Sequence, residues 1–458
     1  MASDSTRDMT TGSPAGMIIR FMIPVFLGNI FQQFYNVADS IVAGQFIGVK
    51  ALAAIGSTGS LMFFVTGWLN GLSSGFAILV SQWFGARQYD RMRHYVAMSV
   101  YLAAGFAILM TAVLMIANVP ILRMMNFSDE IMPDVKAYME IIYAGLIVTA
   151  AYNALASFLR ALGDSRSPLY FLIISAAINV VLDIVFIVNF GMGVEGCAYA
   201  TVIAQGISAV LCFIYILKKF PILHLKKEDF VISFGSFGRL LALGIPMGLQ
   251  FSITAIGTII VQGAVNVYGE VYMAGFSAAG KLQNILSAVF TAFGATIATY
   301  VGQNRGAGRM DRVKVGVKYT QIMILAWSVV VMIAMYFGGK YMTWLFVSPS
   351  ETEVVDAAVT YFHTVFWCYP FLGSIFLYRN TLQGMGYGLV PMLGGVFELV
   401  ARTVIVTIVA GKTSFAGVCL SDPAAWIAAL IPLVPYYFYT MHKWEKKYGA
   451  KQLSDVSK

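Results

Sequence analysis

Long apolar segments alternate with short polar or Gly/Pro-rich segments along almost the whole chain. Most of the apolar segments reach or exceed the roughly 20 residues that an α-helix needs to cross a bilayer. The pattern therefore predicts an all-α integral membrane protein with about twelve transmembrane helices. We expect these helices near residues 17–46, 52–83, 94–118, 135–160, 168–190, 195–218, 239–268, 272–303, 318–346, 356–384, 391–411 and 423–443.

Among the prolines inside these predicted spans are Pro24, Pro246 and Pro370. A proline in a helix interior removes one backbone hydrogen bond and its ring clashes with the preceding turn. We therefore expect a kink at each of the three positions.

Composition and charge agree with a membrane protein and indicate its orientation. The chain is 59% hydrophobic and 11% charged, whereas soluble proteins average about 25% charged residues. With the N-terminus in the cytoplasm, most Lys and Arg residues fall on the cytoplasmic side of the predicted spans, as the positive-inside rule requires. We expect a multi-pass plasma-membrane protein with both termini cytoplasmic. Its net charge of +8 then faces anionic lipid rather than nucleic acid.

The sequence repeats itself at a nearly constant offset. GARQYDRMR at 85–93 returns as GAGRMDRVK at 306–314, an offset of 221 residues (85 to 306). Pro24 and Pro246 lie 222 residues apart, and Gly163 and Gly386 lie 223 apart. Six spans separate equivalent points, so the repeat predicts two six-helix lobes of the same orientation, related by a pseudo-two-fold axis along the membrane normal.

The predicted segments are a polar cytoplasmic N-terminus (1–16), an N-terminal lobe (17–218), a cytoplasmic linker (219–238), a C-terminal lobe (239–443) and a basic cytoplasmic tail (444–458).

Two aspartates, Asp39 and Asp183, lie inside predicted spans of the N-terminal half. An Asp at the centre of a membrane helix costs about 2.5–3.5 kcal/mol, so such residues usually have a function. Helix periodicity places Asn179 on the same face as Asp183. The surrounding polar residues are Gln32, Tyr35, Asn36 and Ser40 on the first span, Asn153 on the fourth and Thr201 on the sixth.

Two carboxylates in an apolar site do not readily both stay ionised, so one carries a proton or both share a cation. Carboxylate, amide and hydroxyl oxygens are hard ligands that suit Na⁺ or H⁺. We therefore predict ion or proton coupling at Asp39, Asn179 and Asp183, and a substrate or coupling cavity around the neighbouring polar residues. The alternative role, above all for Asn36, Asn153 and Thr201, is hydrogen bonding between helices.

The C-terminal half departs from this pattern, because Val261 and Val406 stand near the positions equivalent to the two aspartates. Glu398 and Arg402 lie four residues apart on the eleventh predicted span and can pair on one face. We favour a structural ion pair there over a second transport site.

The chain resembles the multidrug and toxic compound extrusion (MATE) transporters over about residues 17–443. The similarity is carried by PVFLGNIFQQFYNVADSIVAG, GARQYDRMR, RALGDSRSP, INVVLDIVFI and GVEGCAYATVIAQ. It implies export of cationic or amphipathic organic compounds driven by Na⁺ or H⁺ by alternating access between two lobes. It assigns substrate- or ion-linked roles to Gln32, Tyr35, Asp39, Asn153, Asn179, Asp183 and Thr201. Some members of the family place an acidic coupling site on the seventh and tenth spans. Here the seventh span holds no acid and the tenth holds acids only at its outer entrance. The resemblance therefore favours the DinF-like branch, with coupling through the N-terminal lobe.

Two other functions are alternatives to this one. A lipid-linked oligosaccharide flippase of the same superfamily would need a cationic cavity for pyrophosphate, and an intramembrane transferase would need Asp-rich loop motifs. No Walker A motif is present, which argues against ATP-driven transport. We therefore expect a monomeric transporter rather than an enzyme. We expect membrane lipids and small organic cations as partners, no cofactor, and no metal other than Na⁺.

Overall fold

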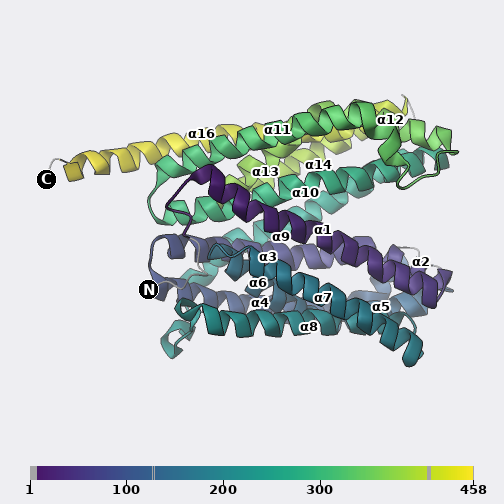
Figure 1. Cartoon of the computed structure of the whole chain (residues 1–458), viewed down its shortest axis with the longest axis horizontal. Coiled ribbons are helices and arrows are strands. Elements are labelled where there is room, and N and C mark those ends of the chain that lie inside the picture. Colours follow the sequence, from purple (N-terminus) through teal and green to yellow (C-terminus); the bar gives the residue numbers. More distant parts are fainter. Residues whose placement is uncertain (1–7, 126, 128, 410–413, 457–458) are drawn as a thin grey trace. The chain divides into compact units, whose positions relative to one another are not determined.

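A computed structural model gives the structure of residues 8–125, 127, 129–409 and 414–456. Within these ranges, the side chains of residues 34–40, 49, 52–53 and 447–456 are not described. Every regular element in the described residues is a helix (Figure 1). The predicted all-α fold is therefore confirmed.

The chain divides into two compact units. Unit 1 contains Met1–Asp8 and Ile23–Gly248, and unit 2 contains Met9–Met22 and Leu249–Lys458. The division falls inside two helices, α1 (Pro14–Phe46) and α9 (Phe234–Asn266). Each of these helices carries one of the repeated prolines, Pro24 or Pro246, within two residues of the division.

The remaining helices follow in chain order. Unit 1 holds α2 (Val49–Ser57), α3 (Gly59–Gly85), α4 (Tyr89–Met124), α5 (Met132–Ala144), α6 (Leu146–Ala161), α7 (Arg166–Ile184), the π-helix η1 (Val185–Asn189), α8 (Val194–Lys219), η2 (Pro221–Leu223) and η3 (Lys227–Phe230). Unit 2 holds α10 (Glu270–Gly306), α11 (Met310–Thr343), α12 (Thr352–Val365), η4 (Phe366–Cys368), α13 (Tyr369–Gly384), α14 (Leu389–Val409), α15 (Phe415–Cys419) and α16 (Ser421–Val456).

Ten helices in the described ranges are long and apolar enough to cross a membrane, and eleven if α5 and α6 count as one bent span. These two helices meet at 49°, and Gly145 stands at the break. A β-carbon there would lie 2.4 Å from Val202 Cγ2, so the close approach of α8 requires glycine at this position.

The structure also divides the predicted span 356–384. It consists of α12 and α13, with 14 and 16 residues, joined by the short helix η4. Pro370 is therefore not a kink inside a helix. It lies in the first turn of α13, where a proline is tolerated because the backbone N–H of that turn has no intrahelical partner.

The internal repeat is visible in the backbone of each unit. Left-handed φ angles occur at Gly48 (120°) and Gly269 (93°), at Arg87 (56°) and Gly308 (72°), and at Gly163 (88°) and Gly386 (83°). These pairs lie 221, 221 and 223 residues apart (48 to 269, 87 to 308, 163 to 386). Such φ angles are uncommon outside glycine, so the two halves form the same turns at matching places.

Inside unit 1, α7 and α8 pack side by side (Figure 1). The start of α7 is fixed by Asp164, whose Oδ1 accepts hydrogen bonds from the backbone N–H groups of Arg166 and Ser167, both at 3.0 Å. A carboxylate at this position satisfies donors that the first helical turn leaves open. The cap sets the register of the helix that carries Asn179 and Asp183.

Candidate functional site

Asp183 and Asn179 lie one turn apart on α7, and both are fully buried, with 0% of each residue exposed. Asn179 Nδ2 donates a hydrogen bond of 3.4 Å to Thr201 Oγ1 on α8. Thr201 is itself 6% exposed. Asn179 and Thr201 therefore meet across two adjacent helices of unit 1, and Asp183 lies one turn from Asn179 on α7.

Burial of Asp183 has a chemical consequence. A carboxylate removed from water loses its hydration and lowers its energy by taking up a proton or a cation, or by accepting hydrogen bonds. Its neighbour Asn179 supplies an amide that bonds across the helix pair. The arrangement can therefore hold H⁺ or a small hard cation.

A π-helix, η1, follows directly after the turn that carries Asp183. Within it the backbone N–H of Phe190 bonds the carbonyl of Val185 at 3.2 Å, a five-residue spacing. π-helical turns are rare and occur often at functional sites. Sequence reasoning did not find it, because the apolar residues Val185–Asn189 read as ordinary continuation of the span.

The predicted residues of α1 are only partly described. Gln32 lies on α1 with its side chain exposed. The side chains of Tyr35, Asn36, Asp39 and Ser40 lie outside the described residues, and only their place on the helix is given. The proposed pairing of Asp39 with Asp183 thus stays a prediction.

On α6, Asn153 is half-buried. One turn earlier, Thr149 Oγ1 donates a hydrogen bond of 2.5 Å to Gln205 Oε1 on α8. This contact between α6 and α8 was not predicted. A Thr and a Gln at scattered positions in apolar runs give no signal until the helices are placed together.

Unit 2 contains a buried group of charged side chains rather than a single ion pair. Arg402 Nη1 lies 3.7 Å from Glu398 Oε2, one turn away on α14. Glu398 Oε1 also accepts a hydrogen bond from Arg379 Nη2 on α13. Arg402 further contacts Asp422 on α16, with Nη2 3.3 Å from Oδ1. The cluster of Arg379, Glu398, Arg402 and Asp422 has no net formal charge.

Two further residues extend this cluster. Tyr361 Oη, on α12, donates to Asp422 Oδ2 at 2.8 Å and also hydrogen-bonds Gln283 on α10. A β-carbon at Gly257 of α9 would lie 3.1 Å from Arg402 Nη1, so the glycine leaves room for the guanidinium. The cluster thereby links five helices of unit 2 and places glycine beside it on a sixth.

In the described part of the chain, no group of three or more His, Cys, Asp or Glu side chains could hold a metal ion. Repeated bundles of apolar helices with buried polar groups define a polytopic membrane protein of the transporter class.

Comparison with known proteins agrees with this class. The MatE family model matches twice, over residues 24–185 and 246–409, and the chain belongs to this family. The two matches follow the internal repeat. The resemblance to MATE transporters is thus confirmed.

Among curated proteins, the chain is 29% identical to "Probable multidrug resistance protein YpnP" of Bacillus subtilis, over 83% of this chain and 84% of the relative. It is 26% identical to "Probable multidrug resistance protein YoeA" of the same organism, over 93% of each. Among solved structures, it is similar to an outward-facing multidrug resistance MATE family transporter of the MOP superfamily. That match has a TM-score of 0.89, 20% identity and coverage of 97% of this chain and 99% of the other.

Proposed function

We propose that this MATE transporter is a secondary active antiporter. It exports cationic or amphipathic organic compounds in exchange for H⁺ or Na⁺ by alternating access. Relatives named as multidrug resistance proteins, similar along most of the chain, support the substrate class. The coupling ion and the exchange mechanism rest on the chemistry of the site.

The observation that carries the proposal is the complete burial of Asp183 beside Asn179 in an apolar segment. Burying a carboxylate in a membrane costs free energy. In an exchanger the carboxylate has a use, because a group that binds a cation in one conformation and releases it in the other couples the fluxes of ion and substrate. In this proposal Asp183 and Asp39 hold the coupling ion and Asn179 orients it. Gln32, Tyr35, Asn36, Asn153 and Thr201 line the route of ion or substrate.

The charged cluster of unit 2 has a different role in this proposal. Each carboxylate contacts a guanidinium, and Arg402 contacts both carboxylates. Removing either carboxylate would leave an uncompensated positive charge in a buried place, which is unfavourable. We therefore assign Glu398 and Arg402, together with their partners, to holding the helices of unit 2 together.

The proposed setting is the plasma membrane, with both termini cytoplasmic and the basic residues facing anionic lipid. The transporter acts as a monomer and uses no cofactor beyond its coupling ion.

The test is efflux of a fluorescent organic cation from proteoliposomes, with a pH gradient and a Na⁺ gradient imposed separately. Wild-type protein should export under one of the two gradients, and Asp183→Asn should not. Asp356→Asn is the matched control, because it removes an exposed carboxylate of unit 2. Export by Asp183→Asn at the wild-type rate would remove this residue from coupling, and no gradient-dependent export by the wild type would overturn the antiport proposal.

A further inference from the structure

The segment that precedes α1 is held on unit 2 by its backbone. Met9 and Thr10 are 2% and 8% exposed. The backbone N–H of Met9 donates to Gln303 Oε1 at 2.9 Å, and Asn304 Nδ2 donates to the Met9 carbonyl at 3.1 Å. Gln303 and Asn304 lie in the last turn of α10 and are fully or almost fully buried. A polar segment of the N-terminus is thus docked rather than solvated.

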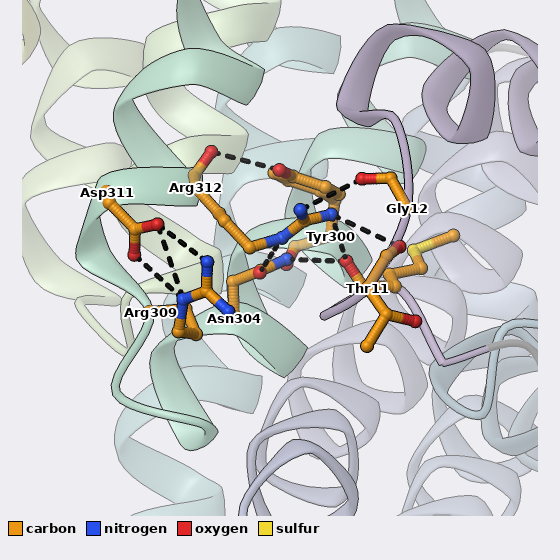
Figure 2. Close-up of polar contacts among 8 residues, drawn as sticks. Thr11, Gly12, Tyr300, Asn304, Arg309, Asp311 and Arg312 are labelled. Carbon is orange, nitrogen blue, oxygen red and sulfur yellow. Dashed lines mark hydrogen bonds and ion pairs between the residues drawn. The ribbon is translucent and has the colours of Figure 1, made fainter.

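Arg312, in the first turn of α11, completes the contact. Its Nη1 donates to the Gly12 carbonyl at 2.9 Å, and its Nη2 to the carbonyls of Met9 at 3.2 Å and Thr11 at 3.3 Å. Figure 2 shows the guanidinium between the N-terminal segment and Asn304. Arg is suited to this task, because its planar group offers five N–H donors in a fixed geometry and stays charged.

The guanidinium is itself held in place. Arg312 Nε donates to Asn304 Oδ1 at 3.0 Å, and the Arg312 carbonyl accepts a hydrogen bond of 2.9 Å from Tyr300 Oη. Because Arg312 contacts only carbonyl oxygens of the segment, the path of the backbone decides binding. That path includes Gly12 at φ +80°, a conformation that a side chain makes costly.

Unit 1 holds the segment before α9 in a comparable way. Arg93 Nε, on α4, donates to Asp229 Oδ2 at 3.2 Å. The neighbouring His94 contacts the Asp229 carbonyl at 3.1 Å and Ser236 Oγ at 3.0 Å. The segment before α1 is thus tied to the first turns of α11, and the segment before α9 is tied to the first turns of α4. These two helices, α1 and α9, are the ones that carry the repeated prolines.

We infer that Arg312 is a positioning residue for transport, acting by fixing the start of α1. This helix carries Gln32, Tyr35, Asn36 and Asp39, so the inference rests on the proposed function for its effect on transport. Residues Met9–Met22 belong to unit 2, whereas α1 belongs to unit 1 from Ile23 onward. The anchor therefore determines where the coupling helix starts, and Pro24 lies two residues after Met22, where this stretch of unit 2 ends.

The anchor is tested first without transport, by hydrogen–deuterium exchange on the full-length protein in lipid nanodiscs. Arg312→Ala removes three charge-assisted hydrogen bonds to the segment. Amides of the peptide that covers residues 8–14 should exchange about tenfold faster or more. Arg309→Ala is the matched control, because Arg309 lies in the same turn but pairs with Asp311. Equal exchange in the Arg312→Ala variant and wild type would overturn the anchor.

Transport then tests the positioning role. Arg312→Ala should lower the maximal efflux rate several-fold with little change in KM, because Arg312 does not touch the proposed cavity. Arg312→Lys should restore part of the rate, since an ammonium reaches fewer of the three carbonyls. Gly12→Val is the second variant, for the case that Arg312→Ala folds poorly. It strains the segment and leaves Arg312 intact, so it should lower the efflux rate in the same way.

The outcomes separate the two proposals. Faster exchange with an unchanged efflux rate would retain the anchor but overturn its role in transport. If wild-type protein shows no gradient-driven efflux, the proposed function fails, whereas the exchange measurement still decides whether Arg312 holds the segment.

Discussion

Arg402 Nη2 lies 3.3 Å from Asp422 Oδ1, while Nη1 of the same guanidinium lies 3.7 Å from Glu398 Oε2. One arginine thus compensates two carboxylates from different helices, and Arg379 provides the second positive charge. Removing a single charge from this cluster of unit 2 therefore leaves an opposite charge buried without compensation.

Glu398→Gln should therefore reduce stability more than coupling. Breaking a buried ion pair costs about 3–5 kcal/mol, which we expect as a lower melting temperature and lower expression. Thermal unfolding in detergent and gradient-driven efflux, normalised to the amount of folded protein, are the measurements. A Glu398→Gln protein that is abundant and stable but uncoupled would place an ion site in unit 2.

Asp183→Asn should abolish gradient-driven efflux and leave the fold intact. The amide keeps the shape of the carboxylate, and removing a buried charge lowers the desolvation cost. Asp39→Asn should have the same effect, and the double variant should be little worse than either single one, because groups that act as a unit are not additive. Efflux and substrate binding measured on all three variants check this. Additive losses would indicate two independent sites.

Arg87→Gly should raise stability slightly. Arg87 has a φ of 56°, whereas the matching position in the second half is Gly308 at 72°. A left-handed residue with a side chain costs about 1–2 kcal/mol, and the exposed contact of Arg87 with Asp8 (3.6 Å) offsets little of this. The reverse change, Gly308→Ala, should lower the melting temperature. A lower melting temperature for Arg87→Gly would show that its side-chain contacts outweigh the strain.

The linker before α9 should be accessible only from the cytoplasm. Glu228 is exposed there, so Glu228→Cys, in a background with Cys368→Ser, should react with a membrane-impermeant maleimide in inverted vesicles but not in intact cells. Ser350→Cys, exposed between α11 and α12, should show the opposite pattern. Labelling of the linker from outside would reverse the assigned orientation.

Much of the architecture could be predicted from the sequence, because membrane spans need long apolar runs and turns need glycine. Spacing alone placed Asn179 and Asp183 on one face of a helix, and the repeat was readable from Gly163 and Gly386. The prediction of a kink inside a helix at Pro370 was wrong, because the break at η4 lies among apolar residues that continue the hydropathy pattern.

The contacts between distant segments could not be predicted. Asp422 meets Arg402 only after α14 and α16 pack together, and neither residue type specifies its partner. The same holds for Arg312, whose sequence neighbours Arg309 and Asp311 suggest an ordinary surface ion pair. The π-helix after Asp183 depends on hydrogen-bond register, which apolar side chains do not encode in a readable way.

The contact between Gly12 and Arg312 also sets an order of events during synthesis. The two residues are 300 positions apart, so at about 5–20 residues per second the arginine leaves the ribosome about 15–60 s after the glycine. Throughout that interval the segment before the first helix lacks the three hydrogen bonds that Arg312 donates to it. Closure of the Arg312 contact is accordingly a late assembly step, and a nascent chain that stops before α11 holds Met9 only through Gln303 and Asn304.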